Sequence, residues 1–312
     1  MTWLQAIILG IVEGLTEYLP VSSTGHLILA QRAMGIAHSD AANAFAVCIQ
    51  AGAILAVLGL YWRRVWQVLR GWAGRLGVGP GDADGTRLGV NLVIAFIPAA
   101  VVGLLCDHWI EQQLFGLWPI VAAWFVGGVA ILAVAWRRKQ KRINSNDAQN
   151  NNTPTSGAAP GAGGELTSLT WRMALAIGVI QCLAMWPGTS RSLVTIVAGV
   201  LVGMRLAAAV EFSFLLGVIT LLAATMYKAL LDKVSVTVSG QPQDMLMLTW
   251  MAHEYGWPAL VIGTLAAWGS AVLAVRWMVA YLNKHGMAIF GYYRIALAIG
   301  VAALILLHLL QP

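Results

Sequence analysis

Long apolar stretches separated by short polar segments dominate the chain. Several of these stretches are uninterrupted and reach the roughly 20 residues that a helix needs to cross the hydrocarbon core of a bilayer. They cover residues 45–62, 88–106, 117–136, 206–227, 257–276 and 292–310. We predict that each of these six stretches is a transmembrane helix. The pattern therefore indicates an all-α polytopic integral membrane protein.

Two further apolar stretches, residues 3–34 and 171–204, are each interrupted by a segment rich in Pro, Gly and Ser. The first break is Pro20–Gly25 and the second is Pro187–Ser192. Proline and glycine break helices, and non-helical backbone at membrane depth has to be buried in protein or line a polar cavity. We therefore predict that both stretches are re-entrant helical hairpins.

Basic residues cluster at the ends of apolar stretches, which is typical of cytoplasmic flanks. Residues 63–87 carry five Arg, and residues 137–142 carry five basic side chains, so both segments are predicted to be cytoplasmic. Residues 107–116 hold two acidic residues and no Lys or Arg, so they are predicted to lie outside. With these assignments each half contains one hairpin followed by three spans, in opposite orientations. This is an inverted-topology repeat.

The predicted repeats are residues 1–138 and 169–312. Residues 139–168 join them, and this segment is of low complexity, first rich in Asn and then in Gly, Ala and Pro. Such a composition cannot bury an apolar face, so we predict a disordered cytoplasmic linker. The two broken stretches also share an order of residue types, because Glu13 and Gln181 each precede Leu, Pro and hydroxyl residues. That order independently supports a duplication.

Composition agrees with this interpretation. The chain is 59% hydrophobic and 10% charged, and its mean hydropathy is +0.75. An ordinary soluble domain is about a quarter charged, so the values exclude a cytosolic enzyme, a disordered protein and a secreted disulfide scaffold. The net charge of +6 comes from the basic flanks, and we predict no nucleic-acid partner. Three cysteines without a CxxC pattern indicate neither a disulfide framework nor a zinc site.

Few ionisable side chains fall inside the apolar stretches, where each costs about 2.5–3.5 kcal/mol. Glu13 and Glu17 are spaced i, i+4, so on a helix they share one face. Two such carboxylates suit a divalent cation or an acid/base pair. The simpler alternative is a pair of solvated charges near a helix end. Glu211 is less informative, and either supports the second hairpin or caps its own helix.

The residues after the first break suit an anion. Ser22, Ser23 and Thr24 offer hydroxyls beside backbone N–H groups freed by the break. His26 follows and titrates near neutral pH. Ser22 taken alone is more simply explained as a helix N-cap.

The second break carries Arg191, a permanent cation that binds phosphate oxygens with two donors. Alternatively, Arg191 forms a structural salt bridge with Glu13 or Glu17 instead of binding a phosphate. If the two hairpins enter from opposite faces, their tips meet near the midplane of the membrane. Carboxylates, hydroxyls, an imidazole and a guanidinium would then converge, which suits a lipid phosphate or diphosphate that recruits a metal.

The two motifs, residues Val12–His26 and Pro187–Thr195, resemble those of the undecaprenyl-diphosphate phosphatases, which are bacterial bacitracin-resistance membrane proteins. The resemblance covers nearly the whole chain except the linker. It implies hydrolysis of undecaprenyl diphosphate to undecaprenyl phosphate and inorganic phosphate, which recycles the lipid carrier of peptidoglycan and other envelope polymers. One residue departs from the pattern, because Ala46 stands where relatives often carry an acid.

The resemblance also implies a divalent cation, Mg²⁺ or Ca²⁺. It places the protein in the bacterial cytoplasmic (inner) membrane, with an active site open to the outer face. Membrane lipids are the other expected partners, and a homodimer is left open.

The motifs assign expected roles. Glu13 and Glu17 hold the metal, and Arg191 binds the phosphates and offsets charge in the transition state. His26 is a general acid/base or a nucleophile. Ser23 is the nucleophile or only orients the phosphate, and direct attack by metal-bound water is the remaining alternative. The remaining expected phosphate-binding residues are Ser22, Thr24, Gly188, Ser190, Ser192 and Thr195.

Two other functions stay open at this point. A transporter or flippase for an anionic lipid or small anion fits the fold, since many transporters are inverted repeats with broken helices. A scaffold without chemistry fits less well, because intramembrane charges are seldom kept for packing.

Overall fold

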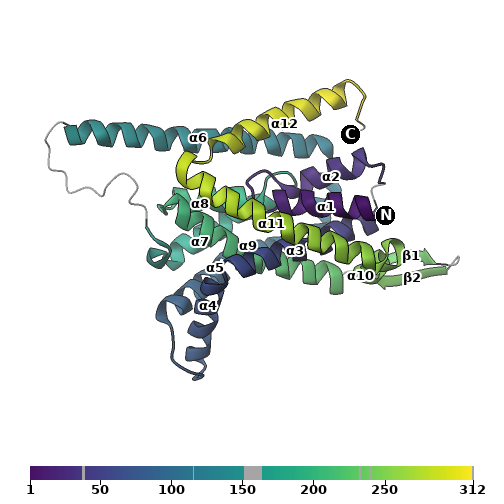
Figure 1. Cartoon of the computed structure of the whole chain (residues 1–312), viewed down its shortest axis with the longest axis horizontal. Coiled ribbons are helices and arrows are strands. Elements are labelled where there is room, and N and C mark those ends of the chain that lie inside the picture. The colour runs from purple at the N-terminus through teal and green to yellow at the C-terminus, as the bar shows by residue number, and fades with distance from the viewer. Residues whose placement is uncertain (37–38, 115, 151–163, 232, 239–240, 311–312) are drawn as a thin grey trace.

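The computed structural model describes residues 1–36, 39–114, 116–150, 164–231, 233–238 and 241–310. Its long helices are α3 (Asp40–Leu60), α5 (Ala83–Leu114), α6 (Leu117–Asn150), α9 (Leu206–Leu230), α11 (Trp257–His285) and α12 (Ala288–Leu306). Its shorter helices are α1 (Trp3–Thr16), α2 (Ser23–Ala33), α4 (Trp62–Arg75), α7 (Trp171–Gln181), α8 (Arg191–Leu201) and α10 (Met247–Tyr255). Two 3₁₀ turns, η1 (Leu166–Ser168) and η2 (Cys182–Met185), and two strands, β1 (Lys233–Val238) and β2 (Gln241–Leu246), complete the fold (Figure 1).

Six helices of the described chain are long and apolar enough to cross a membrane. Their spans are Ala41–Leu60, Ala83–Cys106, Leu117–Arg137, Leu206–Leu230, Trp257–Leu282 and Ala288–Leu306. Large apolar side chains such as Ile97, Leu105 and Leu265 point outward from them, as expected where lipid is the solvent. The predicted all-α, multi-pass membrane protein is confirmed, and the six spans agree with those expected from hydropathy.

The two broken stretches form two pairs of short helices with the same construction. Helices α2 and α8 each have 11 residues, and a serine precedes each of them. These serines, Ser22 and Ser190, have φ values of 77° and 73° and ψ values of 106° and 113°. Residues other than glycine rarely adopt this backbone, which costs about 1–3 kcal/mol. Its occurrence at two equivalent positions supports the predicted duplication, while the re-entrant path and the opposite orientation of the halves stay predictions.

Close contact between helix backbones holds the long helices together. Helices α1 and α11 lie side by side (Figure 1). A Cβ atom at Gly10 would collide with the carbonyl oxygen of Gly263, and one at Gly14 would collide with that of Ala267. Helices in lipid gain little from the hydrophobic effect and associate through small residues of this kind. Helices α6 and α12 form a second such pair.

Some local elements differ from the sequence-based expectation. The loop expected at 63–87 contains α4, on which Trp62, Trp66 and Trp72 are exposed. Between α9 and α10, β1 and β2 form an antiparallel hairpin that pairs Lys233 with Leu246. In β1, Val alternates with Ser and Thr, and this pattern favours a strand.

The linker expected to be disordered at 139–168 is helical at its start, because α6 continues to Asn150. The Arg, Lys and Gln residues that follow the span have high helix propensity, so the helix propagates through them. Residues 166–168 form η1. Residues 151–163 of the expected linker lie outside the described residues.

Substitution of Gly10 tests the close packing of α1 on α11. We expect Gly10→Ala to lower the midpoint of thermal unfolding in detergent, since overpacking costs about 1–3 kcal/mol. Gly269→Ala in α11 is the matched control, because a Cβ atom there meets nothing within 4 Å. Equal melting temperatures for the two variants would contradict the proposed packing.

Candidate functional site

The two breaks meet in the folded protein. The Ser192 hydroxyl donates a hydrogen bond to the backbone carbonyl of Leu19 at 3.0 Å, and Ser190 donates to the same oxygen at 3.4 Å. These contacts place the first turns of α2 and α8 beside one another. The N-terminus of a helix carries partial positive charge and unpaired N–H groups. Two such ends therefore converge on one location.

A polar pocket of about 180 Å³ lies at this junction. Many of the expected site residues line it, namely Glu17, Ser22, Ser23, Thr24, Gly188, Ser190 and Arg191. Gln50 of α3 also lines it, whereas Ala46, one turn earlier on the same helix, does not. The structure therefore gathers hydroxyls, a carboxylate and a guanidinium from both halves of the chain around one cavity.

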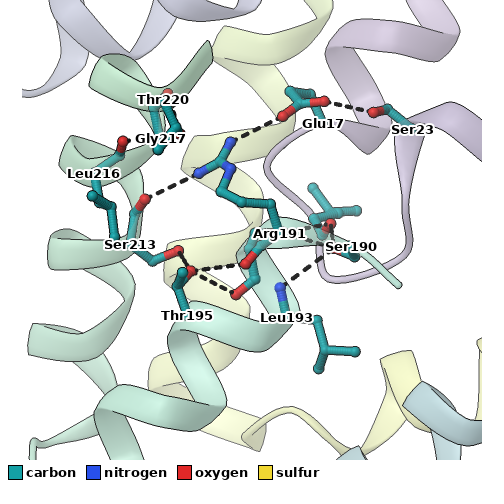
Figure 2. A network of polar contacts seen from close by, with 12 residues as sticks. Glu17, Ser23, Ser190, Arg191, Leu193, Thr195, Ser213, Leu216, Gly217 and Thr220 are labelled. Atoms are coloured by element: carbon teal, nitrogen blue, oxygen red, sulfur yellow. Dashed lines mark hydrogen bonds and ion pairs between the residues drawn. The ribbon is translucent and has the colours of Figure 1, made fainter. Parts of the chain in front are cut away.

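A continuous line of polar contacts crosses this junction (Figure 2). Arg191 donates from Nη2 to Glu17 Oε1 at 2.9 Å, and from Nη1 to the carbonyl of Ser213 on α9 at 3.1 Å. The Ser23 hydroxyl donates to Glu17 Oε2 at 2.5 Å. The guanidinium also lies over the ring of Tyr18, 5.4 Å from its centroid. The structural salt bridge that was the alternative to phosphate binding by Arg191 is thus present, and it joins the two breaks.

The contact between Ser23 and Glu17 has the geometry of a nucleophile and its base. A hydroxyl becomes a nucleophile when an acceptor within hydrogen-bond reach removes its proton, and a third group holds that acceptor. Here Glu17 is the acceptor and Arg191 holds it. Gly217 makes room for this arrangement, because a Cβ atom there would collide with the Arg191 guanidinium.

Glu13 lies one turn before Glu17 and is fully buried. Neither of its carboxylate oxygens has a hydrogen-bond partner among the described residues. This burial excludes the alternative of two solvated charges near a helix end. A buried carboxylate needs a cation or a proton.

The acidic pair fits a divalent cation. Mg²⁺ is commonly held by one or two carboxylates together with water and substrate phosphates. The part of the chain that the structure describes contains no cluster of three or more His, Cys, Asp or Glu side chains. Of the pair, Glu17 lines the polar pocket, whereas the fully buried Glu13 does not. The further ligands of such a cation would have to come from water or substrate.

His26 does not line the polar pocket, and both of its ring nitrogens are engaged in hydrogen bonds. Nδ1 donates to the backbone carbonyl of Ser22 at 2.6 Å. In the neutral ring Nε2 then accepts a hydrogen bond from the Tyr293 hydroxyl, at 2.7 Å. The ring also stacks on Tyr293 and meets the edge of Trp124. Acid/base work by His26 would require Nε2 to leave Tyr293.

The serines at the two breaks play different parts. Ser190 caps α8 by accepting a hydrogen bond from the Leu193 N–H, whereas Ser22 makes no side-chain cap on α2. The capping role considered for Ser22 is therefore wrong, and its side chain lines the pocket instead. Ser192 and Thr195 do not line this pocket. Their hydroxyls bind Leu19 and Ser213 respectively, and so support the breaks and α8.

Arg294 is an important residue that the sequence pattern did not single out. It is fully buried in α12 and donates to backbone carbonyls of both breaks, those of Pro20 at 3.4 Å and Gly188 at 2.9 Å. It also donates to the carbonyls of Ala123 and Trp124 in α6. The sequence signal that could have identified Arg294 is its position as a lone charge near the start of an apolar span. One guanidinium therefore ties both breaks to the α6–α12 pair.

Glu211 does not belong to the site. It forms an ion pair with Arg64 of α4 at 2.6 Å, so neither role considered for it from the sequence is observed.

Fold and site together define a multi-pass membrane protein with a buried polar centre built from two broken helices. A sequence model of the family described as "Bacitracin resistance protein BacA" matches residues 6–300. The chain belongs to this family.

Curated relatives match over nearly their full lengths. A protein of Sorangium cellulosum named undecaprenyl-diphosphatase is 40% identical over 303 residues, covering 95% of this chain and 84% of the relative. A protein of the same name from Methylococcus capsulatus is 38% identical and covers 96% and 93% of the two chains. Another from Nitrosomonas eutropha is 38% identical and covers 99% and 97%.

Removal of the Arg294 guanidinium tests whether it holds the breaks in place. Arg294→Gln leaves buried carbonyls without donors, each at a cost of about 1–3 kcal/mol. We expect a clear drop in the thermal midpoint in detergent. Arg205→Gln is the matched control, since Arg205 and its partner Glu165 are 46% and 67% exposed and such pairs contribute about 0–1 kcal/mol. Similar midpoints for both variants would rule out this role for Arg294.

Proposed function

We propose that this protein is a membrane phosphatase that hydrolyses undecaprenyl diphosphate to undecaprenyl phosphate and inorganic phosphate. The observation that carries the chemistry is the Ser23–Glu17–Arg191 line, in which a hydroxyl, its proton acceptor and a phosphate-binding cation meet in one buried pocket. Family membership and the names of the relatives support the substrate. Such an activity recycles the lipid carrier of cell-wall synthesis and fits bacitracin resistance.

The terminal phosphate binds between the first turns of α2 and α8. Arg191 and Ser190 contact it, and the N–H groups at the start of α2, which Ser22 leaves uncapped, face the same pocket. The phosphate competes with Glu17 for the Arg191 guanidinium. Substrate binding therefore opens the ion pair and frees Glu17 to act.

Ser23 attacks the terminal phosphorus while its proton passes to Glu17. The bond between that phosphorus and the bridging oxygen breaks, and undecaprenyl phosphate leaves with the bridging oxygen. Water then hydrolyses the phosphoserine, returning the proton to Ser23 and releasing inorganic phosphate. The 2.5 Å contact between Ser23 and Glu17 favours this route over direct attack by water with Ser23 only orienting the phosphate. His26 is the second candidate acid/base, through Nε2.

Glu13 and Glu17 would hold a divalent cation, Mg²⁺ or Ca²⁺. When bound, such a cation offsets the negative charge of the diphosphate. The unpartnered oxygens of Glu13 support this assignment.

The isoprenoid tail starts in an apolar cavity of about 420 Å³ that adjoins the polar pocket. The two share Ala184, Arg191 and Leu221, and the cavity extends between α5, α7 and α9. A separate apolar cavity of about 410 Å³ beside α12 shares no residue with the polar pocket, so it is a poorer route for the tail. The rest of the tail lies in lipid.

We place the protein in the bacterial cytoplasmic membrane with its pocket open to the outer face. The Arg-rich segments 63–87 and 137–142 indicate which ends of the spans are cytoplasmic.

Two independent changes test the role of Arg191. Arg191→Ala removes the cation, and Gly217→Ala displaces it without changing charge. We expect each to lower phosphate release from undecaprenyl diphosphate about 100-fold or more, because lost transition-state stabilisation has that magnitude. Gly59→Ala, where a Cβ atom meets nothing within 4 Å, is the control for adding a methyl group to a helix.

Near-normal turnover by folded Arg191→Ala would exclude the role given to Arg191. Wild-type protein that moves the lipid across liposomes but releases no phosphate would be a transporter, contrary to the proposal.

The acidic pair is tested by metal dependence. Glu13→Gln should shift the curve of activity against Mg²⁺ concentration to higher concentration by about tenfold or more, since a carboxylate ligand is lost. Glu211→Gln removes an acid outside the site and should leave the curve unchanged. A curve for Glu13→Gln that overlays the wild type would remove Glu13 from the metal site.

A further inference from the structure

Gln181 is a buried amide that the fold leaves without partners. It is the last residue of α7 and only 2% exposed. Neither Oε1 nor Nε2 has a hydrogen-bond partner among the described residues. Leaving a buried amide unpaired costs stability, so such a group needs an explanation beyond packing.

The surroundings of Gln181 indicate what it could bind. It lines the apolar cavity of about 420 Å³ rather than the polar pocket. Arg191 lines the same cavity, and its Nε atom also lacks a partner. Phe96, Leu104 and Met185 are among the apolar residues around them. Two side chains with unpartnered hydrogen-bond donors therefore line a cavity that is otherwise suited to hydrocarbon.

An amphiphile, with an anionic head and an apolar chain, matches this combination of hydrogen-bond donors and apolar walls. The amide Nε2 and the guanidinium Nε donate hydrogen bonds, which suits the oxygens of an anion. The apolar walls suit an attached chain. Because Arg191 bonds Glu17 through Nη2 and lines both cavities, one guanidinium can contact two adjacent phosphates.

We propose that Gln181 is a substrate-binding residue for the lipid-linked phosphate, the one that stays on the isoprenoid after hydrolysis. The assignment rests on the proposed function, since it divides the diphosphate between the two cavities. The terminal phosphate lies in the polar pocket with Ser23. The lipid-linked phosphate lies between Arg191 Nε and Gln181, where the tail begins.

Comparison with the first half of the chain supports this division. Glu13 occupies the corresponding place on α1, and it too is buried with both side-chain polar atoms unpartnered. A carboxylate suits a cation, whereas an amide can donate to a phosphate oxygen. The pair has one acidic member on the side of the proposed metal and one neutral donor on the side of the lipid.

The test is binding of the product, undecaprenyl phosphate, to purified protein in detergent. Its single phosphate is the lipid-linked one, so binding reports on Gln181 without catalysis. We expect Gln181→Leu to weaken this binding at least tenfold and to raise KM for undecaprenyl diphosphate similarly, with kcat within about threefold of wild type. Gln67→Leu, the same substitution on α4 at a residue that lines neither cavity, should leave binding unchanged.

Stability separates this role from a structural one. If Gln181 only binds substrate, replacing an unpaired buried amide by Leu leaves the thermal midpoint of the unliganded protein unchanged or raises it. A lower midpoint would indicate a structural role and overturn the proposal. Gln181→Glu is the second variant, since it keeps size and shape, and its negative charge should weaken product binding even more.

Unchanged binding of undecaprenyl phosphate to either variant would refute the role of Gln181, whatever the turnover. Failure of the proposed function is a different result, namely wild-type protein that binds undecaprenyl phosphate but releases no phosphate from the diphosphate.

Discussion

The ion pair between Glu17 and Arg191 is the contact on which the site depends. Each partner comes from a different half of the chain, and each alone would be an unpaired charge in an apolar interior, which is strongly destabilising. Neither break can therefore be buried without the other. The ion pair links the two breaks through side chains. Arg294 links them through their backbones, because it donates a hydrogen bond to a free carbonyl of each break. Assembly of the two halves and formation of the site are one event.

The same pair explains how a stable arrangement can also be reactive. Glu17 is held between a cation and the Ser23 hydroxyl, so in the proposed mechanism an anion that attracts Arg191 frees Glu17 to accept the Ser23 proton. The strained backbones of Ser22 and Ser190 present the first turns of α2 and α8 to that anion. Polar groups left unpaired around the junction, on Glu13, Gln181 and Arg191, are those that a metal or a phosphorylated lipid would satisfy.

The six spans were predictable from the sequence because lipid imposes a length of apolar residues that few other environments require. Glu13, Glu17 and Arg191 were predictable because charges stand out in such segments. Arg294 was not, because its partners are backbone carbonyls on distant helices and its place near a span end resembles an orienting charge. The lack of partners for Gln181, and the different parts played by Ser22 and Ser190, likewise depend on contacts between residues far apart in the chain.

The central claim is that the two breaks form one catalytic centre which exchanges its internal ion pair for the substrate. The most direct test is an experimental structure with a non-hydrolysable methylene-diphosphonate analogue of undecaprenyl diphosphate. We expect the terminal phosphonate to lie within hydrogen-bond distance of both Ser23 and Arg191, with Arg191 no longer bonded to Glu17. An analogue bound elsewhere, or bound with the Glu17–Arg191 contact still at its 2.9 Å, would contradict the claim.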